Sequence, residues 1–183
     1  YQQKAIGIGV GLPGVIDSEQ GVVNVADTLK GWEGYALAEH LENEFHLPVF
    51  VENDVKARTL GELIFGSGRN VRDAAYLWLG DGIGAGLVID GRLHHGYTRS
   101  AGEIGYNDVT QPLRGGSRLP LLFRGQDDIG ELLSLSNISR SLGLKPPRSK
   151  SPVAALVKGL RNGDRRAVRL SEEISEVIGS LSI

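Results

Sequence analysis

The chain has 183 residues, of which 40% are hydrophobic and 23% charged, and its formal net charge is -2. This is the composition of a globular protein, and a net charge so close to zero gives no reason to expect binding to nucleic acid or to a membrane surface. Cysteine is absent, which excludes disulfides and thiolate metal sites and favours a reducing, cytoplasmic setting. The sequence contains no run of roughly 18 apolar residues, so no membrane span is predicted.

Glycine makes up 26 of the 183 residues, and the first expected strand, over residues 4–12, already contains three glycines that alternate with aliphatic residues. A dinucleotide-binding motif would need a helix directly after these glycines. A Pro-Gly turn and a short extended pair, around 15–16 and 22–23, follow instead. The glycines therefore predict a strand that packs closely against a neighbouring backbone.

The next stretch predicts a helix over 35–46, a short buried strand over 49–51 and a second helix over 54–66. The apolar face expected for the second helix consists of Ala57, Leu60, Leu63 and Ile64.

Asn53 and Asp54 stand where this strand meets the second helix. Both are good helix caps, but one cap needs only one of them. The other would lie at the carboxyl end of a strand, where open α/β sheets bind ligands, and a carboxylate there suits a general base for a sugar hydroxyl.

A glycine-rich loop, Gly80 to Gly86, is expected between strands at 74–79 and 87–89. Its alternating glycines are suited to present backbone N–H groups to a phosphate, and a plain hairpin is the alternative. Because no helix follows, the loop is not a P-loop.

Two further polar features follow the hairpin. Glu103 lies between glycines in an expected loop, where a carboxylate accepts well from two vicinal hydroxyls; an exposed turn glutamate is the alternative. His94 and His95 lack the spacing of metal ligands and are interpreted as surface residues.

The remainder of the chain is expected to be mostly helical, over 130–142, from 152 to about 161, and from 164 onward. The apolar stripe expected for the last helix consists of Ala167, Leu170, Ile174, Val177 and Leu181. The order of elements predicts an α/β protein with two lobes. Methionine is absent even at position 1, so the chain is interpreted as a piece of a longer protein, truncated at both ends.

Five segments in this order resemble the ROK family of bacterial repressors and sugar kinases: "GIGVGLPGVID", "GWEG", "LPVFVENDVKARTLGE", "YLWLGDGIGAGLVIDGRLHHG" and "SAGEIGY". The resemblance is strong over about residues 5–107. It implies an actin-like ATPase (ribonuclease H-like) fold with two lobes around a central cleft. About 1–70 would belong to the N-terminal lobe and about 71–183 to the C-terminal lobe.

The resemblance also implies roles for individual residues. Asp54 would be the catalytic base if the protein is a kinase. The residues implied to bind sugar are Gly14, Asn53, Asp54, Glu103, Tyr106 and Glu131. The residues matching the family's phosphate loop are Gly80, Asp81, Gly82 and Gly84.

Departures from the family pattern favour the regulator branch. Asp81 stands where the kinases carry a threonine that serves phosphate, and Tyr106 stands where the family has a zinc-binding histidine. The cysteine-rich zinc motif is missing as well, so no structural zinc is expected, and packing is expected to hold the surroundings of residues 107–128. ATP and magnesium are expected only if the protein is a kinase.

Three hypotheses follow: the sugar-effector-binding core of a transcriptional regulator, an ATP-dependent hexose or N-acetylhexosamine kinase, and a degenerate relative without a ligand. For the first, DNA would be bound through an upstream winged-helix domain outside this chain. A small-molecule sugar is the expected partner, the family implies a homodimer or tetramer, and no membrane partner is expected.

Overall fold

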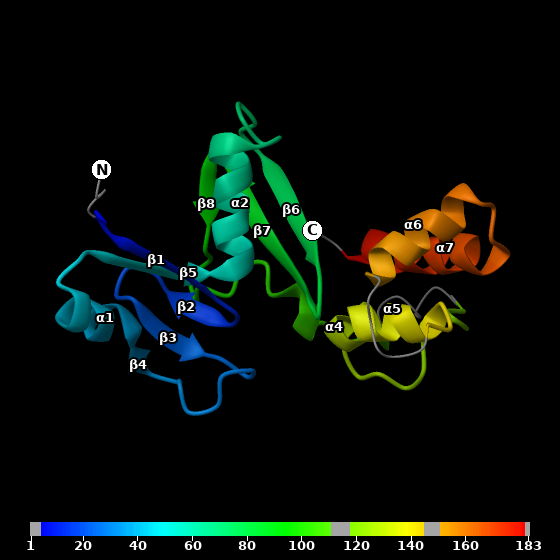
Figure 1. The fold of residues 1–183 in the computed structure, drawn as a ribbon, viewed down its shortest axis with the longest axis horizontal. Coiled ribbons are helices and arrows are strands. Elements are labelled where there is room, and N and C mark those ends of the chain that lie inside the picture. The colour runs from blue at the N-terminus through cyan, green and yellow to red at the C-terminus, as the bar shows by residue number, and fades with distance from the viewer. Residues whose placement is uncertain (1–4, 111–117, 145–150, 182–183) are drawn as a thin grey trace. The chain divides into compact units, whose positions relative to one another are not determined.

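The computed structural model describes residues 5–110, 118–144 and 151–181, which form an α/β structure divided into two compact units (Figure 1). The first unit contains the chain up to Tyr76 together with Ala85–Gly102, and the second contains Leu77–Gly84 and the chain from Glu103 onward. These units differ in extent from the expected lobes, because Ala85–Gly102 packs with the N-terminal residues. The division into lobes at about residue 70 stays a prediction.

Two small sheets build the N-terminal part of the first unit. A parallel pair joins β1 to β5 with Ile8 opposite Val49, and an antiparallel sheet has the order β2-β3-β4. The strands are β1 (Ile8–Leu12), β2 (Val15–Asp17), β3 (Val22–Val25), β4 (Tyr35–Ala36) and β5 (Val49–Asn53). The expected strand at 4–12 and the extended pair are therefore present, with a later start for the first strand.

Helix α1 (Leu37–Phe45) and these strands enclose the core of the first unit. Its buried residues are Ile16, Val23, Ala26, Leu37, Ala38, Val49 and Val51. The expectation of a short buried strand at 49–51 is wrong for Phe50, which is 72% exposed. Because successive side chains of a strand point to opposite faces, Phe50 lies on the face opposite the buried Val49 and Val51.

Helix α2 (Asp54–Phe65) begins where the sequence predicts, but the face it buries is different. Its buried side chains are Val55, Lys56 and Thr59, whereas Ile64 of the expected apolar face is 57% exposed. Two polar side chains, Lys56 and Thr59, are thus buried on a face where the sequence does not predict them.

Strands β6 (Ala74–Leu79), β7 (Ile83–Ile89) and β8 (Arg92–His94) form the third sheet, in that order. The expected glycine loop is shorter than predicted, because β7 already begins at Ile83. A Cβ atom on Gly86 would lie 1.9 Å from the Thr59 hydroxyl oxygen, so this glycine lets β7 approach α2 closely.

The second unit is built mainly from helices around one apolar core. These are a short 3-10 helix (Ile104–Tyr106), α4 (Ile129–Leu132), α5 (Leu135–Ser141), α6 (Pro152–Arg161) and α7 (Arg165–Ser180). The expected single helix over 130–142 is wrong, because Ser134 caps a new helix at this point. The stripe predicted for the last helix is confirmed, since all five of its residues are buried.

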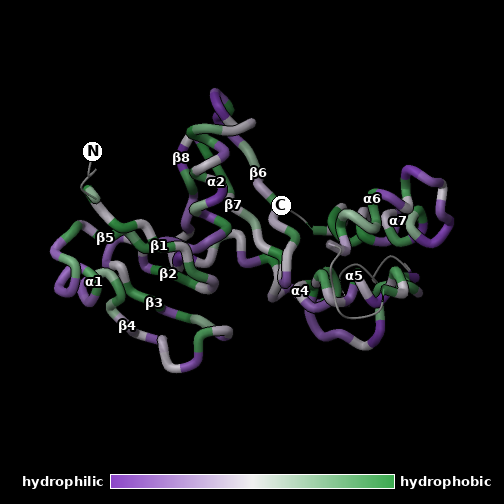
Figure 2. The backbone as a smooth tube through the Cα atoms, viewed as in Figure 1, coloured by the Kyte–Doolittle hydropathy of each residue, from purple (hydrophilic) through white to green (hydrophobic). Residues whose placement is uncertain are grey.

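Hydrophilic residues gather at the turn between α6 and α7, as Figure 2 shows. In the described ranges, none of the helices combines the length and the apolar character that crossing a bilayer requires.

Candidate functional site

Asn53 links the start of α2 to the turn after β1. Its side-chain oxygen accepts hydrogen bonds from the backbone N–H groups of Val55 and Lys56, each at 3.0 Å, which is an N-cap. Its amide nitrogen donates to the carbonyl oxygen of Gly14 at 2.9 Å. Asn53 is only 4% exposed, so its side chain holds Gly14 and the helix in place. Direct sugar binding by Asn53 stays a prediction.

Gly14 occupies a position that a side chain could not fill. Its φ is +109°, and a Cβ there would lie 2.1 Å from the carbonyl oxygen of Val25. Only glycine suits this combination of left-handed backbone and close approach. The turn is therefore fixed on one side by β3 and on the other by Asn53.

Asp54 is the first residue of α2 and is partly exposed. A Cβ on Gly11 of β1 would lie 3.7 Å from the Asp54 Cβ, so the glycine leaves the space beside this carboxylate free of a side chain. A carboxylate in the first turn of a helix is also favoured by the helix dipole. The structure thus brings Gly14, Asn53 and Asp54 together in the first unit.

His95 is not a free surface residue, contrary to the expectation from sequence. One of its ring nitrogens, Nε2, lies 2.7 Å from the Glu52 carboxylate, and the two side chains are 23% and 16% exposed. Glu52 directly precedes Asn53, so the pair connects the end of β5 to the segment after β8.

The second unit brings another group of predicted residues together around Gly105. A Cβ there would lie 2.8 Å from the carbonyl oxygen of Ile83 and 3.7 Å from the Cα of Gly130. The 3-10 helix flanked by Glu103 and ending at Tyr106 therefore packs on both the glycine hairpin and α4, which carries Glu131. Tyr106 is 58% exposed.

A polar cavity of about 430 Å³ lies in this unit. It is lined by Asp81, Gln126, Gly130, Glu131, Ser134, Ser136, Asn137 and Arg140. The predicted phosphate-loop residue Asp81 and the predicted sugar residue Glu131 thus share one cavity, together with the single cation of Arg140. Sequence reasoning did not find Gln126, which lies in the loop before α4, or Asn137 and Arg140 of α5, because none of the three belongs to a recognisable local motif.

The tip of the glycine hairpin is less open than a phosphate loop. The N–H of Gly80 donates to the carbonyl oxygen of Gly82 at 2.8 Å, and the carbonyl of Gly80 accepts from Leu135 at 3.0 Å. At least one of the expected N–H groups is therefore occupied within the protein.

The segment from Leu119 to Gln126 is held by buried polar groups as well as by packing. Glu173 of α7 accepts from the backbone N–H groups of Leu121 and Leu122, each at 3.0 Å. The Asn137 amide donates to the carbonyl oxygen of Leu122 at 2.9 Å. The cysteine-free chain does not fit the family's thiolate zinc motif, and the described residues show no group of three or more potential metal ligands.

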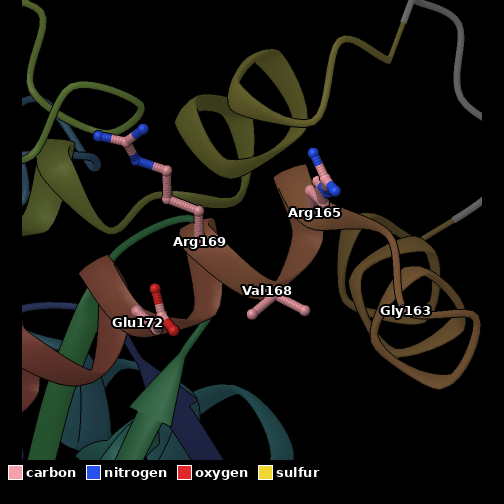
Figure 3. Close-up of a pocket in the computed structure, with 5 residues that line it drawn as sticks. All are labelled: Gly163, Arg165, Val168, Arg169 and Glu172. Carbon is pink, nitrogen blue, oxygen red and sulfur yellow. The ribbon is translucent and has the colours of Figure 1, made fainter.

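Another cavity, of about 500 Å³, lies along the start of α7 and contains none of the predicted site residues. Its lining residues are Gly163, Arg165, Val168, Arg169 and Glu172 (Figure 3).

The predicted residues thus form two groups, each within one compact unit. Gly14, Asn53 and Asp54 belong to the first unit. The others, namely Gly80, Asp81, Gly82, Gly84, Glu103, Tyr106 and Glu131, belong to the second. Binding of one ligand by both groups stays a prediction.

Comparison with known proteins identifies the family. The sequence profile of the ROK family matches residues 1–126. A xylose repressor of Caldicellulosiruptor bescii is 41% identical over 104 residues, which cover 57% of this chain and 26% of the repressor. A glucokinase of Halalkalibacterium halodurans is also 41% identical over 104 residues, covering 57% of this chain and 31% of the kinase.

Among solved structures, the Lmo2764 protein of Listeria monocytogenes superposes with a TM-score of 0.74 at 26% identity, over 98% of this chain and 60% of that one. The fold is the mixed α/β fold of the actin-like ATPases. The matched segments span only about a quarter to a third of the length of these curated relatives. Because the family profile covers more than half of the chain, the chain belongs to the ROK family, which includes both repressors and sugar kinases.

Proposed function

We propose that the chain is the sugar-effector-binding core of a ROK-family transcriptional regulator. The observation that carries this proposal is Asp81, which lines the cavity of the second unit together with Glu131. Two carboxylates and one guanidinium give the cavity an excess of negative charge. Hydroxyl groups donate well to carboxylates, whereas a phosphate carries the same sign of charge.

The size of the repulsion is large enough to matter. Two unit charges about 4 Å apart repel by about 4 kcal/mol at an effective dielectric constant near 20, which corresponds to roughly a thousandfold in affinity. Arg140 compensates part of this, so a thousandfold is the upper bound. Similarity to the xylose repressor supports the same assignment.

In this proposal the sugar acts as an effector. A sugar that binds one conformation more tightly than another shifts the population between them, and a DNA-binding domain elsewhere in the protein reads that shift.

The alternative is an ATP-dependent hexose or N-acetylhexosamine kinase. Asp54 favours it, because this partly exposed carboxylate lies beside a strand that offers no side chain at Gly11. In a kinase, Asp54 would accept the proton of the sugar hydroxyl that attacks the phosphate. The residues at the hairpin do not suit ATP, because the negative charge of Asp81 would repel the phosphates of the nucleotide. Similarity to the glucokinase supports this alternative.

Titration calorimetry with a sugar panel and with magnesium-ATP distinguishes the two functions. For the wild type we expect heat from a sugar and none from magnesium-ATP, and no ADP release with any hexose. The Asp81→Thr variant is expected to gain nucleotide affinity, by at most about a thousandfold. Asp127→Thr, which removes an exposed charge outside the cavity lining, is the matched control. Tight nucleotide binding by the wild type, with turnover lost in Asp54→Asn, would establish the kinase instead.

A further inference from the structure

The segment from His95 to Gly102, here called the His95–Gly102 loop, is a closed loop. The N–H of Ala101 donates to the carbonyl oxygen of His95 at 3.0 Å, and that of Arg99 to Gly96 at 3.2 Å. Arg99 has a φ of +64°, a left-handed conformation that is uncommon for a residue with a side chain. The loop therefore has a defined shape, and outside contacts are needed to hold Arg99 in it.

Three side-chain contacts join this loop to the N-terminal part of the same unit. His95 pairs with Glu52 at 2.7 Å, and the Lys56 ammonium donates to the carbonyl oxygen of Arg99 at 2.5 Å. The Arg99 guanidinium pairs with Glu19 at 2.8 Å, and this hydrogen bond raises the pKa of Arg99 above its ordinary value. The loop is thus held by Glu52, near the end of β5, and by Lys56, in the first turn of α2, on either side of the strand–helix junction.

Lys56 is the most unusual of these anchors, because it is only 1% exposed. Burying an ammonium group is unfavourable unless hydrogen bonds replace its water. The carbonyl oxygen of Arg99 is one such partner, and it belongs to a residue 43 positions away. Neither helix propensity nor amphipathic spacing explains a buried lysine at this position. We therefore attribute the burial of Lys56 to its hydrogen bond with the loop.

The end of the loop is fixed by Gly102. Its carbonyl oxygen accepts from the N–H of Ala85 at 2.8 Å. Its φ is +87°, and a Cβ would lie 1.8 Å from the carbonyl oxygen of Ala85, so no other residue fits. Glu103, the predicted sugar ligand, follows Gly102 directly in the chain.

We infer that Lys56 and the Glu52–His95 pair are positioning residues that set the sugar affinity through the His95–Gly102 loop. Glu52 and Lys56 flank the Asn53–Asp54 pair, so the strand–helix junction carrying two predicted ligands also holds the segment leading into Glu103. This inference rests on the proposed sugar binding.

The test compares four variants of the intact protein with the wild type. Lys56→Met keeps the apolar stem of the side chain and removes its charge, and it leaves the carbonyl oxygen of Arg99 without this donor. His95→Ala removes the pair with Glu52, whereas His95→Gln retains a donor. Arg72→Gln is the matched control, because it breaks an exposed ion pair with Asp90 in the same unit.

The measurements are the dissociation constant of whichever of xylose, glucose and N-acetylmannosamine binds the wild type most tightly, and the amide hydrogen exchange of Ala85 and Ala101. We expect Lys56→Met and His95→Ala to weaken binding at least about tenfold and to speed exchange of these two amides, with His95→Gln and Arg72→Gln close to wild type. If the wild type binds sugar and the Lys56→Met and His95→Ala variants bind it equally well, the inference is overturned, whatever their melting temperature. If the wild type binds no sugar, the proposed function fails and takes the inference with it.

Discussion

At the scale of single residues, Asn53 shows how a predicted ligand is tied to the structure around it. Its side-chain oxygen accepts hydrogen bonds from the N–H groups of Val55 and Lys56 at the start of α2, and its side-chain nitrogen donates to the carbonyl oxygen of Gly14. A helix cap contributes about 1 kcal/mol, and a buried carbonyl left without a donor loses a further ~1 kcal/mol. The side chain thus stabilises two segments that are 39 residues apart in sequence.

This leads to a stability prediction for Asn53→Ala. The free energy of unfolding is expected to fall by about 2 kcal/mol, because both the cap and the bond to Gly14 are lost. Asp164→Ala is the matched control: Asp164 caps α7 by accepting from the N–H groups of Arg166 and Ala167, both in that helix, so about 1 kcal/mol is expected. Chemical denaturation measures both, and equal losses would argue against the contribution of Gly14.

At the scale of elements, α7 organises the second unit through a stripe of apolar residues and one buried carboxylate. Glu173 is 5% exposed and accepts hydrogen bonds from the turn at Leu121 and Leu122. Hydrogen bonds from N–H groups to a buried carboxylate stabilise the folded state. The same N–H groups would destabilise it if they were left without an acceptor.

Glu173→Ala is therefore expected to lower the free energy of unfolding by about 2–4 kcal/mol, since the buried N–H of Leu122 and the partly buried N–H of Leu121 lose their acceptor. The adjacent Glu172 is exposed, so Glu172→Ala should change stability by no more than ~0.5 kcal/mol. Thermal or denaturant unfolding of the two variants provides the comparison. Similar losses in both would contradict the contribution of the turn at Leu121 and Leu122, because alanine raises helix propensity at both positions.

The elements also show how far sequence reasoning reaches. The stripe of α7 was predicted correctly because a repeat of 3.6 residues is a local property of the sequence. The buried face of α2 was predicted wrongly, since Lys56 and Thr59 are buried through partners on distant segments, Arg99 and Gly86. The same reason explains why His95 was interpreted as a surface residue.

At the scale of the whole molecule, the predicted ligand residues are shared between two compact units. Asn53 and Asp54 belong to the first, and Glu103 and Glu131 to the second. The family assignment and the fold do not depend on this arrangement, whereas the proposed sugar binding does.

The most direct test of this central claim is calorimetric titration of one sugar into the wild type, Asp54→Asn, Glu103→Gln and the double variant. We expect one sugar per chain for the wild type and at least about tenfold weaker binding for each single variant, because each carboxylate accepts hydrogen bonds from the same ligand. Wild-type affinity in either single variant would contradict the claim that residues of both units bind one sugar.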